Sequence, residues 1–317
     1  MKLQSCLNGS AAAEPRSGRR RGVAGGCRLR ARKSQFVQIF RTTPARTVCP
    51  NFYVLSHANG CRFKPRCTYC YLMSSFWYLR EDQAFTNVDK IVREIRRWMG
   101  KHDLESYVLN TGNLSDSLTF EDVRPLMGEL FELFRQAEGK PHTLLLVTKG
   151  GREHCRFFME TKPCANVVVS FSVNAPAAAR KMERGAALVS DRLAAARALK
   201  KRGWRVRMRL DPLIWGYDYA GVIDAVRRLA PERVTLGTLR AEPGLLKMGA
   251  NGIFKELVLP DEPNGLARYS MARRLALYRP AVKALRQVCP VALCEEEAPV
   301  WDALGLDKEA RLCNCNV

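Results

Sequence analysis

The chain has 317 residues, of which 47% are hydrophobic, and its 52 Lys and Arg against 31 Asp and Glu give a formal net charge of +21. It contains no run of 18 or more apolar residues and no apolar segment of a secretory signal, which argues against a membrane-spanning or exported protein and predicts a cytoplasmic one. Twelve cysteines in such a chain are expected to be reduced thiols rather than a disulfide framework.

The first 48 residues are strongly basic, with 11 Lys and Arg against one acid and a net charge of 11 − 1 = +10. Basic clusters at residues 19–21 and 28–33 lie among Gly, Ala and Ser without apolar periodicity. We therefore expect residues 1–48 to be a disordered extension and residues 49–317 to form one catalytic domain. Such an extension can bind nucleic acid through phosphate contacts, and a purely solvated tail explains its composition equally well.

Beyond this extension, short β-rich runs alternate with helical patterns, which is typical of repeated βα units around a parallel sheet. The expected strands span residues 52–55, 107–110, 143–148, 167–172, 205–210, 233–237 and 291–294. The expected helices span residues 88–98, 120–136, 190–201, 219–229 and 267–288. Because catalytic groups of such folds lie where strands end, the polar residues after each strand are candidate site residues.

Three cysteines, Cys61, Cys67 and Cys70, lie within ten residues in the spacing C-x5-C-x2-C. Each thiolate can bind one iron of a [4Fe–4S] cluster, which leaves the fourth iron open to a substrate or cofactor. Zinc is the main alternative. A structural zinc site normally takes four ligands, and only His57 and Cys49 lie near enough in sequence to complete one.

This cysteine loop, with an aromatic residue on either side of Cys70, resembles that of the radical S-adenosylmethionine (SAM) enzymes, specifically the spore photoproduct lyase family. The resemblance extends over residues 50–317, is strongest at the loop, and departs from the usual C-x3-C-x2-C spacing. It implies a partial (β/α)6 TIM-like barrel, a [4Fe–4S] cluster with SAM on its open iron, and reductive cleavage of SAM to methionine and a 5′-deoxyadenosyl radical. It also implies an electron donor such as flavodoxin or ferredoxin.

The resemblance assigns SAM-binding roles to polar residues after the second and third strands. Asn113, Ser115 and Asp116 lie in the loop that receives the methionine amino group in relatives. Lys149 follows the third strand and is expected to pair with the SAM carboxylate. Without the resemblance, an ordinary turn explains the residue types around Asn113, because Gly, Asn, Ser and Asp are common in turns.

The fourth and fifth strands end in further candidates. Ser172 and Asn174 are expected near the ribose or the carboxylate of SAM, and Arg209 lies in a segment that resembles the family's R-x-D-P motif. The alternative for Arg209 is a structural ion pair with Asp211 near the barrel mouth.

The candidate catalytic residues are Cys294 and Tyr69. In the DNA-repair lyases a cysteine before a Thr-Ser-Asp type turn returns a hydrogen atom to the substrate radical, but Asn110 occupies that position here. Cys294 is the candidate replacement as hydrogen or electron donor. Tyr69 is a candidate for radical transfer, with core packing as the alternative role.

The remaining thiols near the C-terminus allow a second metal site. Cys289, Cys294, Cys313 and Cys315 suffice in number for a further cluster or a zinc ion, but their spacing matches no standard zinc motif. Free or redox-active tail cysteines are the alternative that the spacing favours.

The sequence therefore predicts a radical SAM enzyme whose substrate it does not identify. One alternative is photoproduct-lyase-like repair or other modification of nucleic acid, which the basic extension favours. The other is a non-catalytic protein that binds zinc and nucleic acid. No membrane partner is expected.

Overall fold

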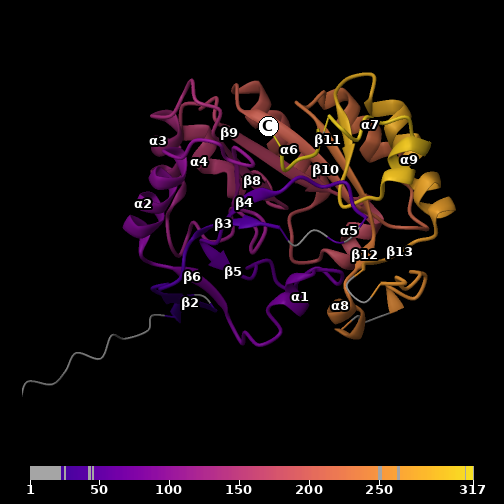
Figure 1. Cartoon of the computed structure of the whole chain (residues 1–317), viewed down its shortest axis with the longest axis horizontal. Coiled ribbons are helices and arrows are strands. Elements are labelled where there is room, and N and C mark those ends of the chain that lie inside the picture. Colours follow the sequence, from indigo (N-terminus) through magenta and orange to yellow (C-terminus); the bar gives the residue numbers. More distant parts are fainter. Residues whose placement is uncertain are drawn as a thin grey trace, which may run out of the picture.

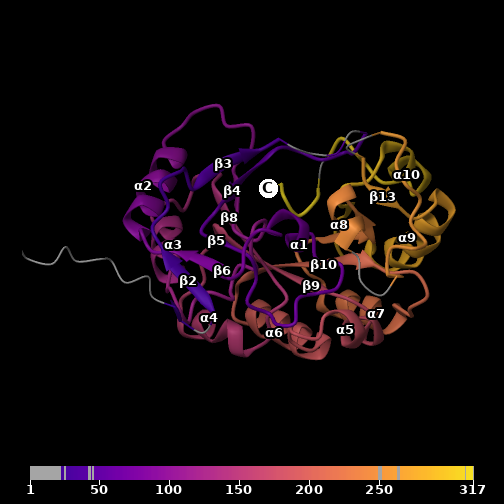
Figure 2. The same cartoon turned by 90° about the horizontal axis from the view of Figure 1, so that it is seen from below.

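The structure is a computed structural model that describes residues 23–24, 26–41, 44, 46–248, 252–262, 265–310 and 312–316. A curved eight-stranded sheet lies at its centre, in the order β14-β11-β10-β9-β8-β7-β4-β3 (Figures 1 and 2). Its strands are β3 Val37–Phe40, β4 Phe52–Leu55, β7 Val108–Asn110, β8 Thr143–Thr148, β9 Val167–Val173, β10 Arg205–Leu213, β11 Val234–Thr238 and β14 Val291–Leu293. All neighbouring pairs are parallel except β3 and β4.

Helices cover the outer face of this sheet and follow one another around it (Figure 2). They are α2 Val88–Met99, α3 Met127–Arg135, α4 Arg156–Glu160, α5 Pro176–Met182, α6 Val189–Lys201, α7 Ala220–Leu229, α9 Met271–Leu285 and α10 Ala298–Ala303. Helix α2 shows why: Ile91, Ile95 and Trp98 are buried on one side, whereas Arg93 and Arg96 on the other side are exposed. Among the described residues, no helix is long and apolar enough to cross a membrane.

The sheet does not close on itself, because β14 and β3 form its two ends. Residues 47–49, between β3 and β4, cross to the other end and pair with the chain after β14. Thr47 forms an antiparallel bridge with Glu297, and the Val48 N–H donates to the Glu296 carbonyl at 2.8 Å. This crossing segment joins the two ends of the sheet.

Smaller elements complete the fold. A second sheet contains β1 Val23–Ala24, β2 Cys27–Arg30, β6 Asp82–Phe85 and β5 Ala58–Asn59, and β12 Arg240–Ala241 pairs with β13 Ala267–Arg268. The short helices α1 Leu72–Ser75 and α8 Pro243–Met248 lie inside the curve of the sheet, and the 3-10 helix η1 spans Glu153–Cys155.

The prediction that residues 1–48 form a disordered extension is wrong for residues 27–40. Within this range, β2 pairs with β6 and β3 pairs with β4. The side chains of Cys27 and Phe36 are fully buried, so this basic segment contributes apolar groups to two cores despite its composition. Residues 1–22 of the same prediction lie outside the described residues.

The seven predicted strands are confirmed, and two predicted helices start too early. Helix α3 begins at Met127 rather than at residue 120, because Pro125 disfavours helix and the Glu121 carboxylate accepts from the Leu126 and Met127 N–H groups at 3.0 and 3.1 Å. Helix α9 begins at Met271 because Ala267 and Arg268 form β13.

Candidate active site

A cavity of about 600 Å³ lies within the curve of the sheet and is lined at the strand ends by Asn110, Thr148, Ser172 and Asp211. The same cavity is lined by Cys61, Cys67 and Cys70. The loop that carries these cysteines, residues 60–72, is called the cluster loop below. Thus the two sets of residues that the sequence singled out separately lie around one space.

Asp82 in β6 holds the start of the cluster loop. Its carboxylate accepts from the Cys61 N–H at 3.2 Å and pairs with Arg66 at 2.5 Å and Lys64 at 2.6 Å. Gly60 permits this close contact, because its φ is 98° and a Cβ at this position would lie 2.1 Å from an Asp82 oxygen. The loop is therefore fixed by a buried carboxylate outside the cysteine motif.

The three thiols of the cluster loop are close enough to influence one another. Burial raises the pKa of Cys67 to about 12 and that of Cys61 well above its ordinary value, and a charge on Cys70 raises the pKa of both thiols further. Binding to a metal deprotonates such thiols, so burial of neutral sulfur is compatible with a ligand role.

The donor set fits an iron–sulfur cluster. Among the described residues, no three or more His, Cys, Asp and Glu side chains are close enough to hold a single metal ion. A cubane cluster binds each thiolate at a different iron, so three separated thiols around a cavity suit it. Three soft sulfur donors on one loop, with no fourth on the same loop, match a cluster with one open iron.

His57 does not join the cysteines as a zinc ligand, because both of its ring nitrogens are engaged. Arg124 Nη2 donates to Nδ1 at 2.7 Å, which leaves Nε2 to donate to Ser115 Oγ at 3.2 Å. Ser115 Oγ in turn donates to the Thr111 carbonyl at 3.3 Å. Burial and the Arg124 guanidinium hold the pKa of His57 well below its ordinary value. His57 and Ser115 thus stabilise the loop after β7.

The other predicted residues of this loop also brace it. Asp116 accepts from the Leu118 N–H at 3.0 Å, the Thr148 hydroxyl at 2.9 Å and the Lys149 N–H at 2.8 Å. The Asn113 carbonyl accepts from the Tyr71 hydroxyl. Asn113, Ser115 and Asp116 all line the cavity, although both carboxylate oxygens of Asp116 already accept hydrogen bonds within the protein.

Lys149, Tyr69 and Ser172 also line the cavity, whereas Asn174 does not. The Lys149 ammonium lies 6.0 Å from the centre of the Tyr69 ring, and the Tyr69 hydroxyl donates to Glu183. Asn174 is fully buried, and its amide donates to Glu183 at 3.2 Å and accepts from the Tyr219 hydroxyl at 2.7 Å. The expectation that Asn174 contacts SAM is therefore not met, because its polar atoms hold other elements together.

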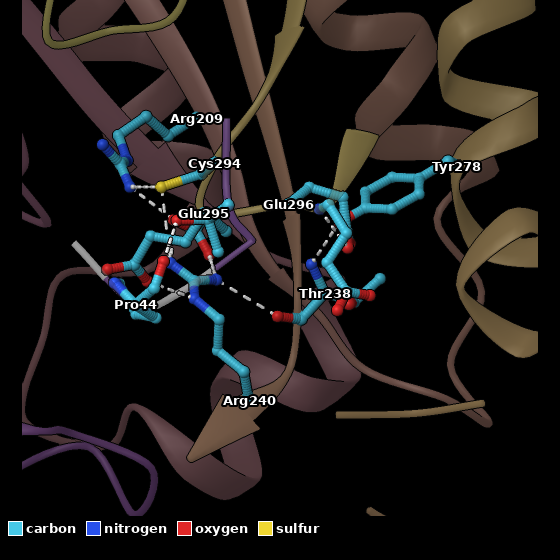
Figure 3. A network of polar contacts seen from close by, with 11 residues as sticks. Pro44, Arg209, Thr238, Arg240, Tyr278, Cys294, Glu295 and Glu296 are labelled. Carbon is cyan, nitrogen blue, oxygen red and sulfur yellow. Dashed lines mark hydrogen bonds and ion pairs between the residues drawn. The ribbon is translucent and has the colours of Figure 1, made fainter. Parts of the chain in front are cut away.

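A further group that lines the cavity contains Arg209, Asp211, Arg240, Cys294 and Glu295, called the arginine wall below. Figure 3 shows Arg209, Arg240, Cys294 and Glu295 of this group close to one another. Arg209 and Arg240 each place Nη2 3.3 Å from Cys294 Sγ. Both guanidiniums pair with Asp211, Arg240 at 2.8 Å, and Arg240 also pairs with Glu295 at 2.5 Å. The ion pair between Arg209 and Asp211 exists, and Arg209 also lines the cavity, so the two expectations for this residue are compatible.

Of the four C-terminal thiols whose number would allow a second metal site, only three line the cavity. Cys289 lies at the end of α9, where its thiol donates to the Leu285 carbonyl at 3.8 Å, and it does not line the cavity. Cys294, Cys313 and Cys315 do line it, together with Cys49 from the crossing segment. Sequence distance concealed the position of Cys49, because residues 47–49 reach the end of β14 only in the folded chain.

Several important residues carried no recognisable signal in the sequence. Asp82, which follows Glu81, and Glu183 lie in segments to which the sequence pattern assigned no element. Glu183 is 2% exposed and pairs with Arg192 at 2.6 Å. Arg240 also carries no signal of its own, because its contact with Cys294 spans 54 residues.

Comparison with known proteins agrees with this fold. The family model of spore photoproduct lyase matches residues 27–237. Spore photoproduct lyase complexed with dinucleoside spore photoproduct is 16% identical, with a TM-score of 0.68 over 85% of this chain and 82% of that chain. A mutant spore photoproduct lyase with bound AdoMet and dinucleoside spore photoproduct is 17% identical, with a TM-score of 0.64 over 85% and 82%. No curated protein matches the sequence.

A mixed α/β fold with a parallel sheet and a three-cysteine loop at its cavity defines the radical SAM class of proteins. Because the family model covers more than half of the chain, the protein belongs to the spore photoproduct lyase family of this class.

Proposed function

We propose that this protein is a radical SAM enzyme with the partial (β/α)6 barrel of that class, a [4Fe–4S] cluster on Cys61, Cys67 and Cys70, and SAM as cofactor. The observation that supports it is that the three thiols and the polar strand ends line one cavity. When bound, the cluster supplies the electron that cleaves SAM reductively to methionine and a 5′-deoxyadenosyl radical. A reduced carrier protein such as flavodoxin or ferredoxin is the proposed electron source.

Lys149 is the residue that we assign to the carboxylate of SAM. Its ammonium lies beside the cluster loop, close enough for its charge to lower the pKa of Cys67 and of Cys70. A charge-assisted contact from this position fixes the cofactor in orientation as well as in place. Ser172 and the exposed edge of the Asn113 loop complete the polar surroundings of the cofactor.

Cys294 is the proposed hydrogen donor. Burial and the nearby Asp211 hold the pKa of Cys294 well above its ordinary value, so the sulfur keeps its hydrogen at neutral pH. The two guanidiniums at 3.3 Å fix the thiol against the arginine wall, facing the cavity. Asn110, at the position of the donor cysteine in the DNA-repair lyases, instead accepts from the Gly112 N–H at 2.8 Å. Tyr69 remains a proposed radical-transfer residue because its ring lines the cavity.

The test is anaerobic reconstitution with iron and sulfide, reduction with dithionite in the presence of SAM, and assay of 5′-deoxyadenosine. We expect product from the native chain and from Cys289→Ala, whose thiol lies outside the cavity, and none from Cys67→Ala. Zinc without iron after anaerobic preparation, together with no product, would leave the non-catalytic zinc-binding protein as the better account.

Repair of a nucleic-acid lesion is the second candidate function. One solved spore photoproduct lyase is complexed with a dinucleoside spore photoproduct, and the present chain has a net charge of +21. The replacement of the donor cysteine by Asn110 argues against the same reaction. Supplying the reconstituted enzyme with the dinucleoside lesion separates the two: restored thymidine supports repair, and turnover of SAM without repair favours another substrate.

A further inference from the structure

One group of cavity-lining residues has no role in the proposed reaction. Cys49, Thr235, Cys313, Asn314 and Cys315 line the cavity, and we call this group the cavity floor. Cys49 comes from the crossing segment, Thr235 from β11, and the other three from the C-terminal segment. The group therefore joins three parts of the chain that are distant in sequence.

Two arginines hold the C-terminal segment in this position. Arg207 Nη1 donates to the carbonyls of Asn314 at 2.9 Å and Asn316 at 2.8 Å, and Arg233 Nη1 donates to the Cys313 carbonyl at 3.3 Å. Arg207 is fully buried and also pairs with Glu232 at 2.8 Å. These contacts use main-chain atoms, so the side chains of residues 313–315 are left to the cavity.

The polar side chains of the floor are buried without partners. Asn314 is 1% exposed, and neither its amide nitrogen nor its amide oxygen has a hydrogen-bond partner among the described residues. The Thr235 hydroxyl, also 1% exposed, has none either. An unsatisfied buried polar group costs about 1–3 kcal/mol, so two of them facing one cavity indicate a missing ligand.

The thiols of the floor lie close to one another. Thr47 and Val48 pair with the chain that follows β14, which brings Cys49 to the floor. Burial is the main cause that raises the pKa of Cys49, to about 12, and a charge on Cys313 raises it further. Burial also raises the pKa of Cys315, and charges on Cys313 and Cys49 add to this effect. Three soft donors that line one cavity together with unpaired hydrogen-bond donors suit an iron–sulfur cluster, whose sulfides accept hydrogen bonds.

We propose that the cavity floor binds a second iron–sulfur cluster through Cys49, Cys313 and Cys315. The Asn314 amide and the Thr235 hydroxyl donate to its inorganic sulfides. Assembly takes up ferrous and ferric iron in equal number together with sulfide, and it releases the protons of the sulfide and of the three thiols, so that no electron is gained or lost. Cys294 stays outside this set because both guanidiniums of the arginine wall contact its sulfur.

The experiment is iron and acid-labile sulfide analysis of the anaerobically reconstituted full chain. Two cubane clusters give about eight irons per chain, and we expect about four in Cys313→Ser/Cys315→Ser and about four in Cys61→Ala/Cys67→Ala/Cys70→Ala. Cys289→Ser, a thiol outside the cavity, should keep the native content. Four irons in the native chain, or a content unchanged by Cys313→Ser/Cys315→Ser, overturns the proposal, as does stoichiometric zinc that this variant loses.

A second measurement avoids dependence on variants that fail to fold. In the loaded native chain, Cys49, Cys313 and Cys315 should resist alkylation by iodoacetamide, and removal of iron with a chelator should make all three reactive, as mapped by mass spectrometry. Equal reactivity before and after removal of iron contradicts the proposal. Neither readout depends on SAM cleavage, so failure of the proposed function and failure of this inference are distinguishable.

Discussion

The two sides of the cavity hold their sulfur atoms in different ways. The cluster loop carries three thiols within ten residues, and one carboxylate, Asp82, anchors the loop. The arginine wall carries one thiol, Cys294, and fixes it with two guanidiniums that share Asp211. The loop thus gathers its thiols within one short segment that a single carboxylate anchors, whereas the wall depends on charges brought together from several strands. The two sides should respond differently when one residue is changed.

The largest effect is expected when Asp211 is replaced. Asp211→Asn leaves two buried guanidiniums with only Glu295 as a charged partner on this wall, and breaking a buried pair in this way costs about 4 kcal/mol. Chemical denaturation measures the loss. Asp224→Asn, which removes an exposed carboxylate that also pairs with two arginines, is the matched control and should change little. Equal losses in both variants would contradict the importance of burial at the arginine wall.

On the other side, Gly60→Ala should disturb the cluster loop. The new methyl group meets the Asp82 carboxylate and the backbone has φ at 98°, so we expect a loss of about 3 kcal/mol of unfolding free energy and poorer iron loading. Gly139→Ala is the control, because Gly139 has φ at 87° but open space around it. It should cost about 1 kcal/mol from backbone strain alone. If the two variants behaved alike, the contact with Asp82 would not hold the loop.

Acid should weaken the arginine wall in a way that the loop does not share. Arg240 and Arg209 hold the pKa of Asp211 far below its usual value despite burial. The unfolded chain therefore binds the proton more readily, and the stability that Asp211 contributes is present above about pH 4 and is lost as the pH falls below it. The unfolding free energy should change with pH by at most about 1.4 kcal/mol per pH unit because of this carboxyl group. Denaturation at pH 5, 4 and 3 should show a smaller slope in Asp211→Asn than in the native chain.

The smallest expected change is in cofactor affinity. Lys149→Met removes the proposed carboxylate partner, and we expect the KM for SAM to rise about tenfold, equivalent to about 1.4 kcal/mol, with kcat little changed. Lys140→Met, at an exposed lysine, is the control. An unchanged KM for SAM in Lys149→Met would remove Lys149 from the cofactor site.

The parts of the fold that could be predicted are those with strong local signals. The core strands are largely apolar runs such as Val167–Val173, and the three cysteines form a dense motif, so neither signal depends on contacts that are distant in sequence. The same reasoning failed for residues 27–40, where alternation of basic and apolar residues concealed two short strands. Charge dominated the composition of that segment, but Cys27 and Phe36 decide its place in the fold.

The site was harder to predict wherever a side chain had more than one available partner. Ser172 and Asn174 follow the same strand in the same orientation, yet only Ser172 lines the cavity, because Glu183 and Tyr219 occupy the amide of Asn174. Cys289 and Cys49 show the same limit. Cys289 could be counted with the tail thiols in sequence but lies outside the cavity, whereas the crossing segment brings Cys49 to it.

The crossing segment also has a practical consequence. A shortened chain that starts at residue 49, as composition alone would suggest, lacks β3 and the Thr47 and Val48 contacts with Glu297 and Glu296. Both ends of the sheet would then present unpaired main-chain groups to water, and the cavity would lose Cys49's neighbouring contacts along one side. A version trimmed for easier expression should therefore begin no later than β2, at Cys27.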